Sequence, residues 1–117
     1  MSSRQCINEV TLAGYIGSVR TQQIQDVTLC NLTVATQCVI SNVNEAVLEV
    51  TWHNVAYCNK PGNAVAEKLQ KGAFVHVRGR IRNVRHTDRE GKEVIVNEIV
   101  AAELEVLNPT EEECQDE

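Results

Sequence analysis

Arginines are concentrated in one short stretch of this 117-residue sequence, residues 74–86, which reads FVHVRGRIRNVRH. The stretch contains four arginines and a fifth follows it: Arg78, Arg80, Arg82, Arg85 and Arg89. Each guanidinium is a planar fork of N–H donors that binds phosphate through two parallel hydrogen bonds. Side chains two positions apart on a β-strand share one face at a spacing of about 7 Å. We therefore expect a row of cations suited to a polyanion.

The apolar residues of this stretch alternate with the arginines. Val75, Val77, Gly79 and Ile81 are predicted to face the core, while His76 lies on the arginine face. Val84 breaks this alternation, so a bulge or the end of the strand is expected near residue 83. The alternative is that the arginines are solvated, or are paired with acids of the following strand such as Glu98, Glu103 and Glu105.

Aromatic side chains, which stack on the bases of single-stranded nucleic acids, are few. Trp52 and Tyr57 lie five apart in one predicted strand and so on opposite faces, and Trp52 is the better candidate for stacking. Phe74 is in phase with the arginines but begins its strand, so this position assigns it neither to the core nor to the binding face. His86 ends the arginine stretch and presents a planar ring. Arg20 and Lys92 complete the predicted nucleic-acid-binding set.

Catalytic and metal chemistry find little support. No nucleophile lies beside a plausible base, and neither an HExxH motif nor a glycine-rich phosphate loop is present. The five cysteines contain no CxxC pair and are interpreted as reduced thiols. We expect no enzyme activity, no metal site and no cofactor.

Charge is distributed unevenly along the chain. The formal net charge is −5, from 16 acidic and 11 basic residues. Five of the acids follow residue 110, so the body is neutral and the tail carries the imbalance. We predict one domain over residues 1–108 and a disordered acidic tail over 109–117. No apolar run is long enough to span a membrane and no targeting segment is evident, so a soluble, cytoplasmic protein is expected.

Hydrophobic periodicity predicts five strands and one short helix. The strands are expected over 8–19, 27–37, 47–58, 73–85 and 93–107, with residues 20–26 and 38–46 as connections. Pro61 and Gly72 bound a helix of two or three turns. Ala101 and Ala102 suggest a bulge in the last strand. This order predicts an all-β fold, a five-stranded OB-fold barrel with its helix between the third and fourth strands. A meander sandwich would have the same strand count.

Four segments taken in order resemble the bacterial single-stranded DNA-binding protein family. They are INEVTLAGYIGSV, LCNLTVAT, TWHNVAYCNKPGNAVAEKLQKGAFVHVRGRIR and HTDREGKE, and the resemblance covers about residues 7 to 107. It implies that Trp52 stacks on DNA bases and that His53 lies at a subunit interface of a homotetramer. It also implies that Arg78, Arg80, Arg82 and Arg85 contact the DNA backbone.

The sequence departs from the family pattern at several aromatic positions. Cys58 stands at a family phenylalanine and His86 at a tryptophan, and Gln37 to Val39 lack an aromatic residue. The tail ends in Asp116 and Glu117, without the apolar tip through which the family docks partner proteins. These departures reduce the stacking surface that the resemblance would otherwise imply.

Two functions follow from these observations. The first is non-enzymatic, largely sequence-independent binding of single-stranded DNA in replication, recombination or repair by a bacterial or phage-like homo-oligomer, with replication or repair proteins as partners. The alternative is an OB-fold subunit of a primosome-type assembly that binds nucleic acid weakly. Trp52 fluorescence separates them, because oligonucleotide quenches it only in the first case.

Overall fold

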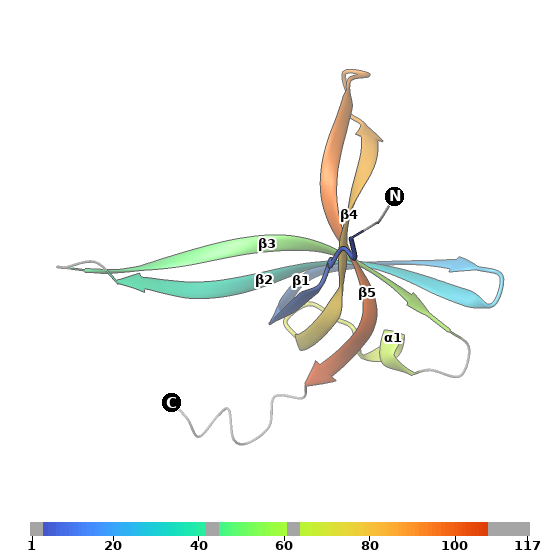
Figure 1. The fold of residues 1–117 in the computed structure, drawn as a ribbon. Helices are drawn as coiled ribbons and strands as arrows, with labels where there is room; N and C mark the ends of the chain where they lie inside the picture. Colours follow the sequence, from blue (N-terminus) through green and yellow to red (C-terminus); the bar gives the residue numbers. More distant parts are fainter. Residues whose placement is uncertain (1–3, 42–44, 61–63, 108–117) are drawn as a thin grey trace.

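A closed barrel of five strands forms the centre of the computed structural model (Figure 1). The structure describes residues 4–41, 45–60 and 64–107. The elements are β1 (Val10–Ile24), β2 (Val27–Ser41), β3 (Ala46–Asn59), α1 (Val65–Lys68), β4 (Phe74–Thr87) and β5 (Glu93–Leu107). The order around the barrel is β1-β2-β3-β5-β4. The predicted all-β OB-fold with its helix between β3 and β4 is confirmed.

The barrel closes because β1 changes partner along its length. Its first half pairs with β4, from Val10 opposite Gly79 to Tyr15 opposite Phe74. From Tyr15 onward it pairs with β2. At the crossover, a Cβ on Gly14 would collide with the carbonyl oxygen of Ala35. Only glycine allows the two backbones to approach so closely. A short parallel ladder, Val55–Tyr57 against Ile99–Ala101, joins β3 to β5.

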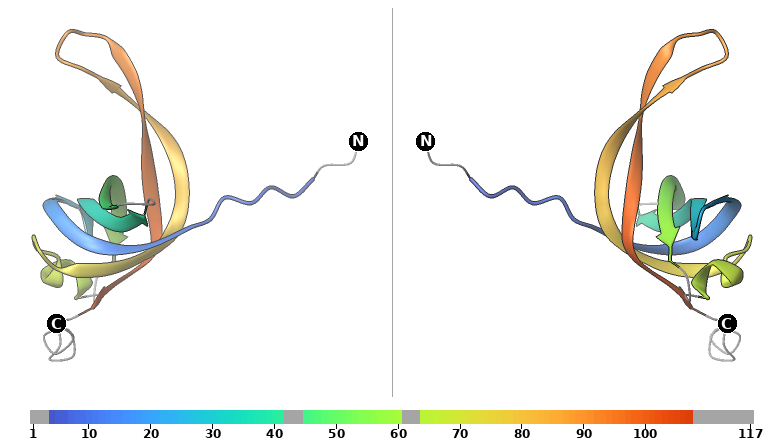
Figure 2. Two further views of the ribbon diagram at one scale, coloured as in Figure 1. Left: turned by 90° about the vertical axis from the view of Figure 1, so that its left-hand side faces the viewer. Right: turned by 90° about the vertical axis from the view of Figure 1, so that its right-hand side faces the viewer.

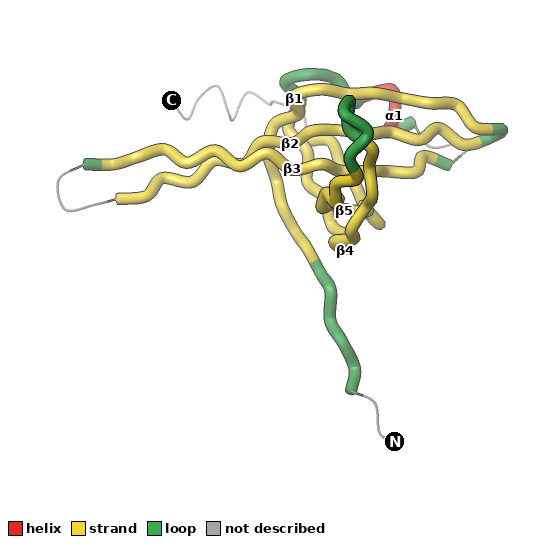
Figure 3. Tube along the Cα trace, turned by 90° about the horizontal axis from the view of Figure 1, so that it is seen from above, coloured by secondary structure: helices red, strands yellow, loops and turns green. Residues whose placement is uncertain are grey.

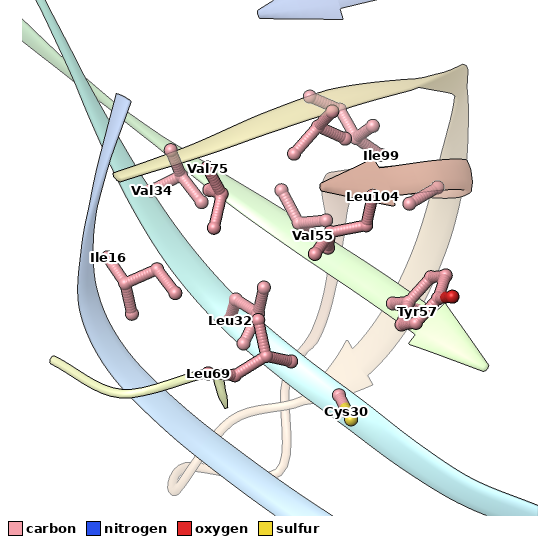
Figure 4. Close-up of a cluster of buried hydrophobic side chains, with 12 residues drawn as sticks. Ile16, Cys30, Leu32, Val34, Val55, Tyr57, Leu69, Val75, Ile99 and Leu104 are labelled. Atoms are coloured by element: carbon pink, nitrogen blue, oxygen red, sulfur yellow. The ribbon is translucent and has the colours of Figure 1, made fainter. Parts of the chain in front are cut away.

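The core lies inside the barrel and consists mainly of β-branched and leucine side chains (Figure 4). Val34, Val75 and Val77 are completely buried. The single turn of α1 precedes Leu69, which is buried against the same cluster. The predicted helix of two or three turns was therefore too long. Its expected start at Pro61 lies outside the described residues.

Two long hairpins extend beyond the barrel. We call residues 37–41 with 46–51 the β2–β3 arm, and residues 82–98 the β4–β5 arm. The arms project in different directions in Figure 1, and Figure 3 shows the β2–β3 arm and the β1–β2 hairpin pointing to opposite sides. The radius of gyration is 17.2 Å, against about 13 Å for a compact domain of this length. The shape is thus a small barrel with long extensions.

Three sequence expectations were wrong in the β1–β2, β2–β3 and β4–β5 hairpins. Residues 20–24 and 38–41 belong to β1 and β2, not to connections. β1 runs to Ile24 and reverses through Gln25, whose φ is 55°. β4 continues to Thr87 in unbroken register with β5, with neither an end nor a bulge near residue 83. The three errors have one cause. Both faces of the hairpin are largely exposed at these positions, so apolar and polar residues do not alternate as they do in a strand with one buried face. The predicted acidic tail lies outside the described residues.

Candidate nucleic-acid interface

The outward face of β4 carries the predicted cations. Val75 and Val77 point into the core, so the residues between and beyond them, Phe74, His76, Arg78 and Arg80, face away from it. On the neighbouring β1, Thr11, Ala13 and Tyr15 are exposed on the same side, opposite Arg78, His76 and Phe74. This outer β4 face therefore forms a continuous surface with the beginning of β1.

Three of the arginines have acidic partners on β5. The ion pairs are Arg78 with Glu103 at 3.0 Å, Arg82 with Glu98 at 2.9 Å and Arg85 with Glu93 at 3.7 Å. The pairing that the sequence left as an alternative therefore exists for these three. The Arg78 and Arg82 pairs are partly to largely exposed, so each stabilises the fold by only about 0.2–1 kcal/mol. Phosphate can therefore compete with these carboxylates.

Arg80 differs from its neighbours because of a bulge in β5. Arg78 pairs with Glu103 and Gly79 with Ala101, which leaves Ala102 as an extra residue. A bulge in this strand was predicted at Ala101 and Ala102. The shifted register places Val100 opposite Arg80. Within the described residues, no carboxylate lies within 4 Å of the Arg80 guanidinium, so its charge remains available.

Asn8 fixes the backbone beside Arg80. Its Nδ2 donates to the carbonyl oxygen of Ile81 at 2.7 Å, and the Ile81 N–H donates to Asn8 Oδ1 at 3.0 Å. The side chain thus replaces one step of a strand ladder, where β4 extends past Val10, the first residue of β1. Figure 2 shows the segment before β1 leaving the barrel past β4. Sequence reasoning missed Asn8, because the partner lies 73 positions away.

An open groove of about 370 Å³ separates the β4–β5 arm from the outer face of β1, β2 and β3. One wall is formed by β1, β2 and β3, and its polar residues include Arg20, Asn31, Thr33 and Asn54. The other wall includes Val84 and His86 of β4 and Val96 and Glu98 of β5. The groove therefore brings together Arg20 and His86, which are 66 positions apart in the sequence.

Trp52 is the most exposed aromatic ring of the sheet, with 61% of its surface accessible. Its indole lies over Gly17, where an added Cβ would be 2.8 Å from the Cη2 atom. Tyr57, in contrast, is 8% exposed and belongs to the core cluster. Its ring is therefore unavailable for stacking, and the prediction that Tyr57 binds nucleic acid was wrong.

The remaining predicted residues lie at the base of the β2–β3 arm and at the tip of the β4–β5 arm. His53 is half-buried, and its Nε2 is 2.9 Å from the Thr36 hydroxyl. Arg89 and Lys92 are exposed in the turn at the tip of the β4–β5 arm. The Asp88 carboxylate orders this turn by accepting from the backbone N–H of Glu90 and of Lys92. The tip therefore presents two cations on a hydrogen-bonded loop.

Tyr15 and Phe74 form an aromatic pair that the sequence analysis did not include in the site. Their ring centroids are 4.8 Å apart and the rings meet edge to face at 68°. The available signal was that Tyr15 falls between the core positions Gly14 and Ile16, while Phe74 is in phase with the arginines. Their contact depends on the β1–β4 pairing, which neither segment reveals alone.

The described residues contain neither a cluster suited to a metal ion nor an ionised core thiol. No group of three histidine, cysteine or acidic residues lies close enough to hold a metal ion in the described part of the chain. Burial, and then the neighbouring Cys58, raises the pKa of the Cys30 thiol. Cys30 is therefore a neutral apolar residue of the core.

The closed five-stranded barrel, with its helix between β3 and β4 and a cationic outer face, defines an OB-fold protein. Residues 7–107 match the model of the single-strand binding protein family. The chain belongs to this family.

Several relatives support this assignment. The single-stranded DNA-binding protein of Xylella fastidiosa is 33% identical over 105 residues, covering 86% of this chain and 63% of the relative. That of Neisseria meningitidis serogroup A is 30% identical over 106 residues, covering 86% and 60%. The chain thus spans somewhat over half the length of these relatives. The Plasmodium falciparum SSB complex with single-stranded DNA matches with a TM-score of 0.75 at 19% identity, covering 92% of this chain and all of that one. This structural likeness concerns the fold. Among the described residues, no helix is long and apolar enough to cross a membrane.

Proposed function

We propose that this chain binds single-stranded DNA without catalysis and largely without sequence preference, in DNA replication, recombination or repair. The observation that carries the proposal is the outer β4 face, where Arg80 has no acidic partner among the described residues. The family membership and the names of the Xylella and Neisseria relatives support the same ligand.

The proposed mechanism combines phosphate contacts with limited stacking. Arg20, Arg80, Arg89 and Lys92 are exposed and belong to none of the observed ion pairs. They supply the sequence-independent attraction to the backbone. Trp52 stacks on a base, and His86 contributes a second, weaker surface in the groove. Because phosphates and base faces are common to all sequences, such a site does not require a particular base.

We further propose that the chain acts as a homotetramer. Apolar side chains are exposed on the β2–β3 arm, with Val39 64%, Leu48 57% and Val47 48% accessible. Their burial between copies would remove this apolar surface from water. His53 lies at the base of the same arm, where the family resemblance expects a subunit contact. Light scattering should then show about four times the chain mass of 13.0 kDa, and His53→Asp should lower that value.

Titration with oligo-dT at several salt concentrations tests DNA binding. With four phosphate-binding cations per subunit, log K should fall against log salt with a slope of about −3, at about 0.7 for each contact on a single strand. Trp52 emission should be quenched on binding, and Trp52→Leu should abolish that signal and weaken the complex. A dissociation constant above about 100 µM at low salt would reject the proposal.

A further inference from the structure

A row of polar side chains crosses the floor of the groove between the β4–β5 arm and the outer face of β1, β2 and β3. Ser18 of β1 is opposite Thr33 of β2, and their hydroxyl oxygens are 2.9 Å apart. Thr33 is in turn opposite Asn54 of β3. All three residues line the groove. The floor is therefore polar across three neighbouring strands.

Glu98 of β5 continues this row. The parallel ladder places Val55 beside Ile99, and both of these side chains belong to the core. The residues one position earlier, Asn54 and Glu98, therefore face outward at the point where β3 and β5 begin to separate. Both of them line the groove. An amide and a carboxylate thus lie on neighbouring strands in its floor.

The Glu98 carboxylate is held in one orientation by Arg82. Its Oε1 accepts from Arg82 Nε at 3.0 Å and lies 2.9 Å from Nη2 of the same guanidinium. The Glu98 side chain is 19% exposed, whereas the acids of the other two ion pairs, Glu103 and Glu93, are 67% and 62% exposed. Within the described residues, both contacts use Oε1 and none uses Oε2. Glu98 therefore presents a fixed hydrogen-bond acceptor at the groove, and Arg82 offsets its charge.

A fixed acceptor beside an amide matches only some of the bases. A carboxylate accepts hydrogen bonds and donates none, whereas the Asn54 amide can also donate. Cytosine and adenine carry an exocyclic amino group next to a ring nitrogen that accepts. In thymine and uracil a carbonyl oxygen replaces the amino group, and a carboxylate repels it. Acidic side chains that contact bases in protein–DNA complexes accordingly accept from the amino group of cytosine.

We propose that Glu98, together with Asn54, recognises the exocyclic amino group of one base in the groove and favours cytosine and adenine there over thymine and uracil. This inference rests on the proposed function and adds a base preference to it. Contacts to phosphates and to base faces do not distinguish the bases. The preference therefore concerns one position of the bound strand, and binding stays largely independent of sequence.

Oligonucleotides that differ only at the recognised group test the preference. Oligo-dC and oligo-dU differ in the exocyclic group and in the hydrogen on the adjacent ring nitrogen. At pH 8 the wild type should bind oligo-dC about 5- to 10-fold more tightly, the lower part of the range for a contact that reads a base. An oligonucleotide of 2-pyrimidinone, which is cytosine without its amino group, should lose this advantage.

Glu98→Gln should abolish the preference, because a carboxamide can offer either an acceptor or a donor to the base. Glu103→Gln is the matched control. Glu103 also pairs with an arginine of β4 at 3.0 Å, but it does not line this groove. Both substitutions release one arginine, so a gain through phosphate contacts is common to both. Only Glu98→Gln should change the ratio of the oligo-dC and oligo-dU affinities.

The possible results separate this inference from the proposed function. If the wild type binds oligo-dC and oligo-dU equally well, recognition of the amino group is refuted while the proposed function stands. A ratio that persists in Glu98→Gln refutes the assignment to Glu98. The 2-pyrimidinone comparison uses the wild type alone, so binding as tight as that of oligo-dC refutes the inference even where Glu98→Gln does not fold. If the wild type binds none of these oligonucleotides, the proposed function itself fails.

Discussion

Replacing Glu98 or Glu103 with glutamine tests whether the acids of β5 hold the arginines of β4 away from phosphate. In the free protein these carboxylates pair with Arg82 and Arg78 at 2.9 and 3.0 Å. Glutamine keeps the size of the side chain but removes its charge. Each substitution should therefore release one guanidinium for binding to the DNA backbone.

The expected magnitude follows from counterion release. Each released cation adds about 0.7 to the size of the salt slope, so the slope should steepen from about −2.8 for four contacts to about −3.5 for a single variant and to about −4.2 for both together. At 0.1 M salt, one such contact corresponds to about a fivefold gain in affinity. The fold should tolerate the change, because exposed ion pairs contribute only about 0.2–1 kcal/mol.

Glu105→Gln is the matched control for this experiment. Glu105 is on the same strand but pairs in register with His76, so its removal deletes the same charge without releasing an arginine. Fluorescence anisotropy of labelled oligo-dT at five salt concentrations would determine the slopes of the wild type, the three single variants and the double variant. Equal slopes in the Glu98, Glu103 and Glu105 variants would refute the reasoning, because the effect would then be one of net charge alone.

Three further predictions concern individual contacts. Gly17→Ala should displace the Trp52 indole, because the added Cβ would lie 2.8 Å from Trp52 Cη2. The fluorescence emission of the free protein should therefore change and DNA affinity should fall several-fold. An unaltered emission spectrum would contradict this. Asn8→Ala removes both hydrogen bonds to the Ile81 backbone and should weaken DNA binding through the position of Arg80, so its effect should largely vanish in an Arg80→Ala background; additive losses would show that Asn8 acts elsewhere. Since burial raises the pKa of Cys30, its thiol should stay neutral and resist alkylation at pH 8 in the native protein while the exposed thiol of Cys58 reacts; rapid labelling of Cys30 would refute its placement in the core.

The barrel was predictable from sequence because its strands have one buried face. Val75 and Val77 alternate with polar residues, and that period alone places them in the core and the arginines outside. Trp52 and Tyr57 could likewise be assigned to opposite faces from their spacing. The arms could not be predicted in this way. Their apolar residues, such as Val39 and Leu48, are exposed, so the order of apolar and polar residues there is not set by a buried face.

The pairing of strands that are distant in the sequence was the second feature that could not be predicted from the sequence. Whether an arginine of β4 meets an acid or a valine of β5 depends on the register beyond Ala102, and one extra residue changes every later partner. The sequence suggested the bulge but not which arginine it would leave without a partner. The contact between Tyr15 and Phe74 likewise depends on how far β1 follows β4 before turning to β2.

The β2–β3 arm lacks a core of its own, and this has a consequence for the energetics of assembly. All of its described residues between 37 and 51 are exposed, so cross-strand hydrogen bonds and side-chain pairs alone hold it together. Such a hairpin can open at a free energy far below that of global unfolding. Part of the affinity of any partner that orders the arm is therefore spent on suppressing its fluctuations. The molecule therefore combines a rigid barrel, in which the strand register is fixed, with a flexible β2–β3 arm that can change conformation when a partner binds it.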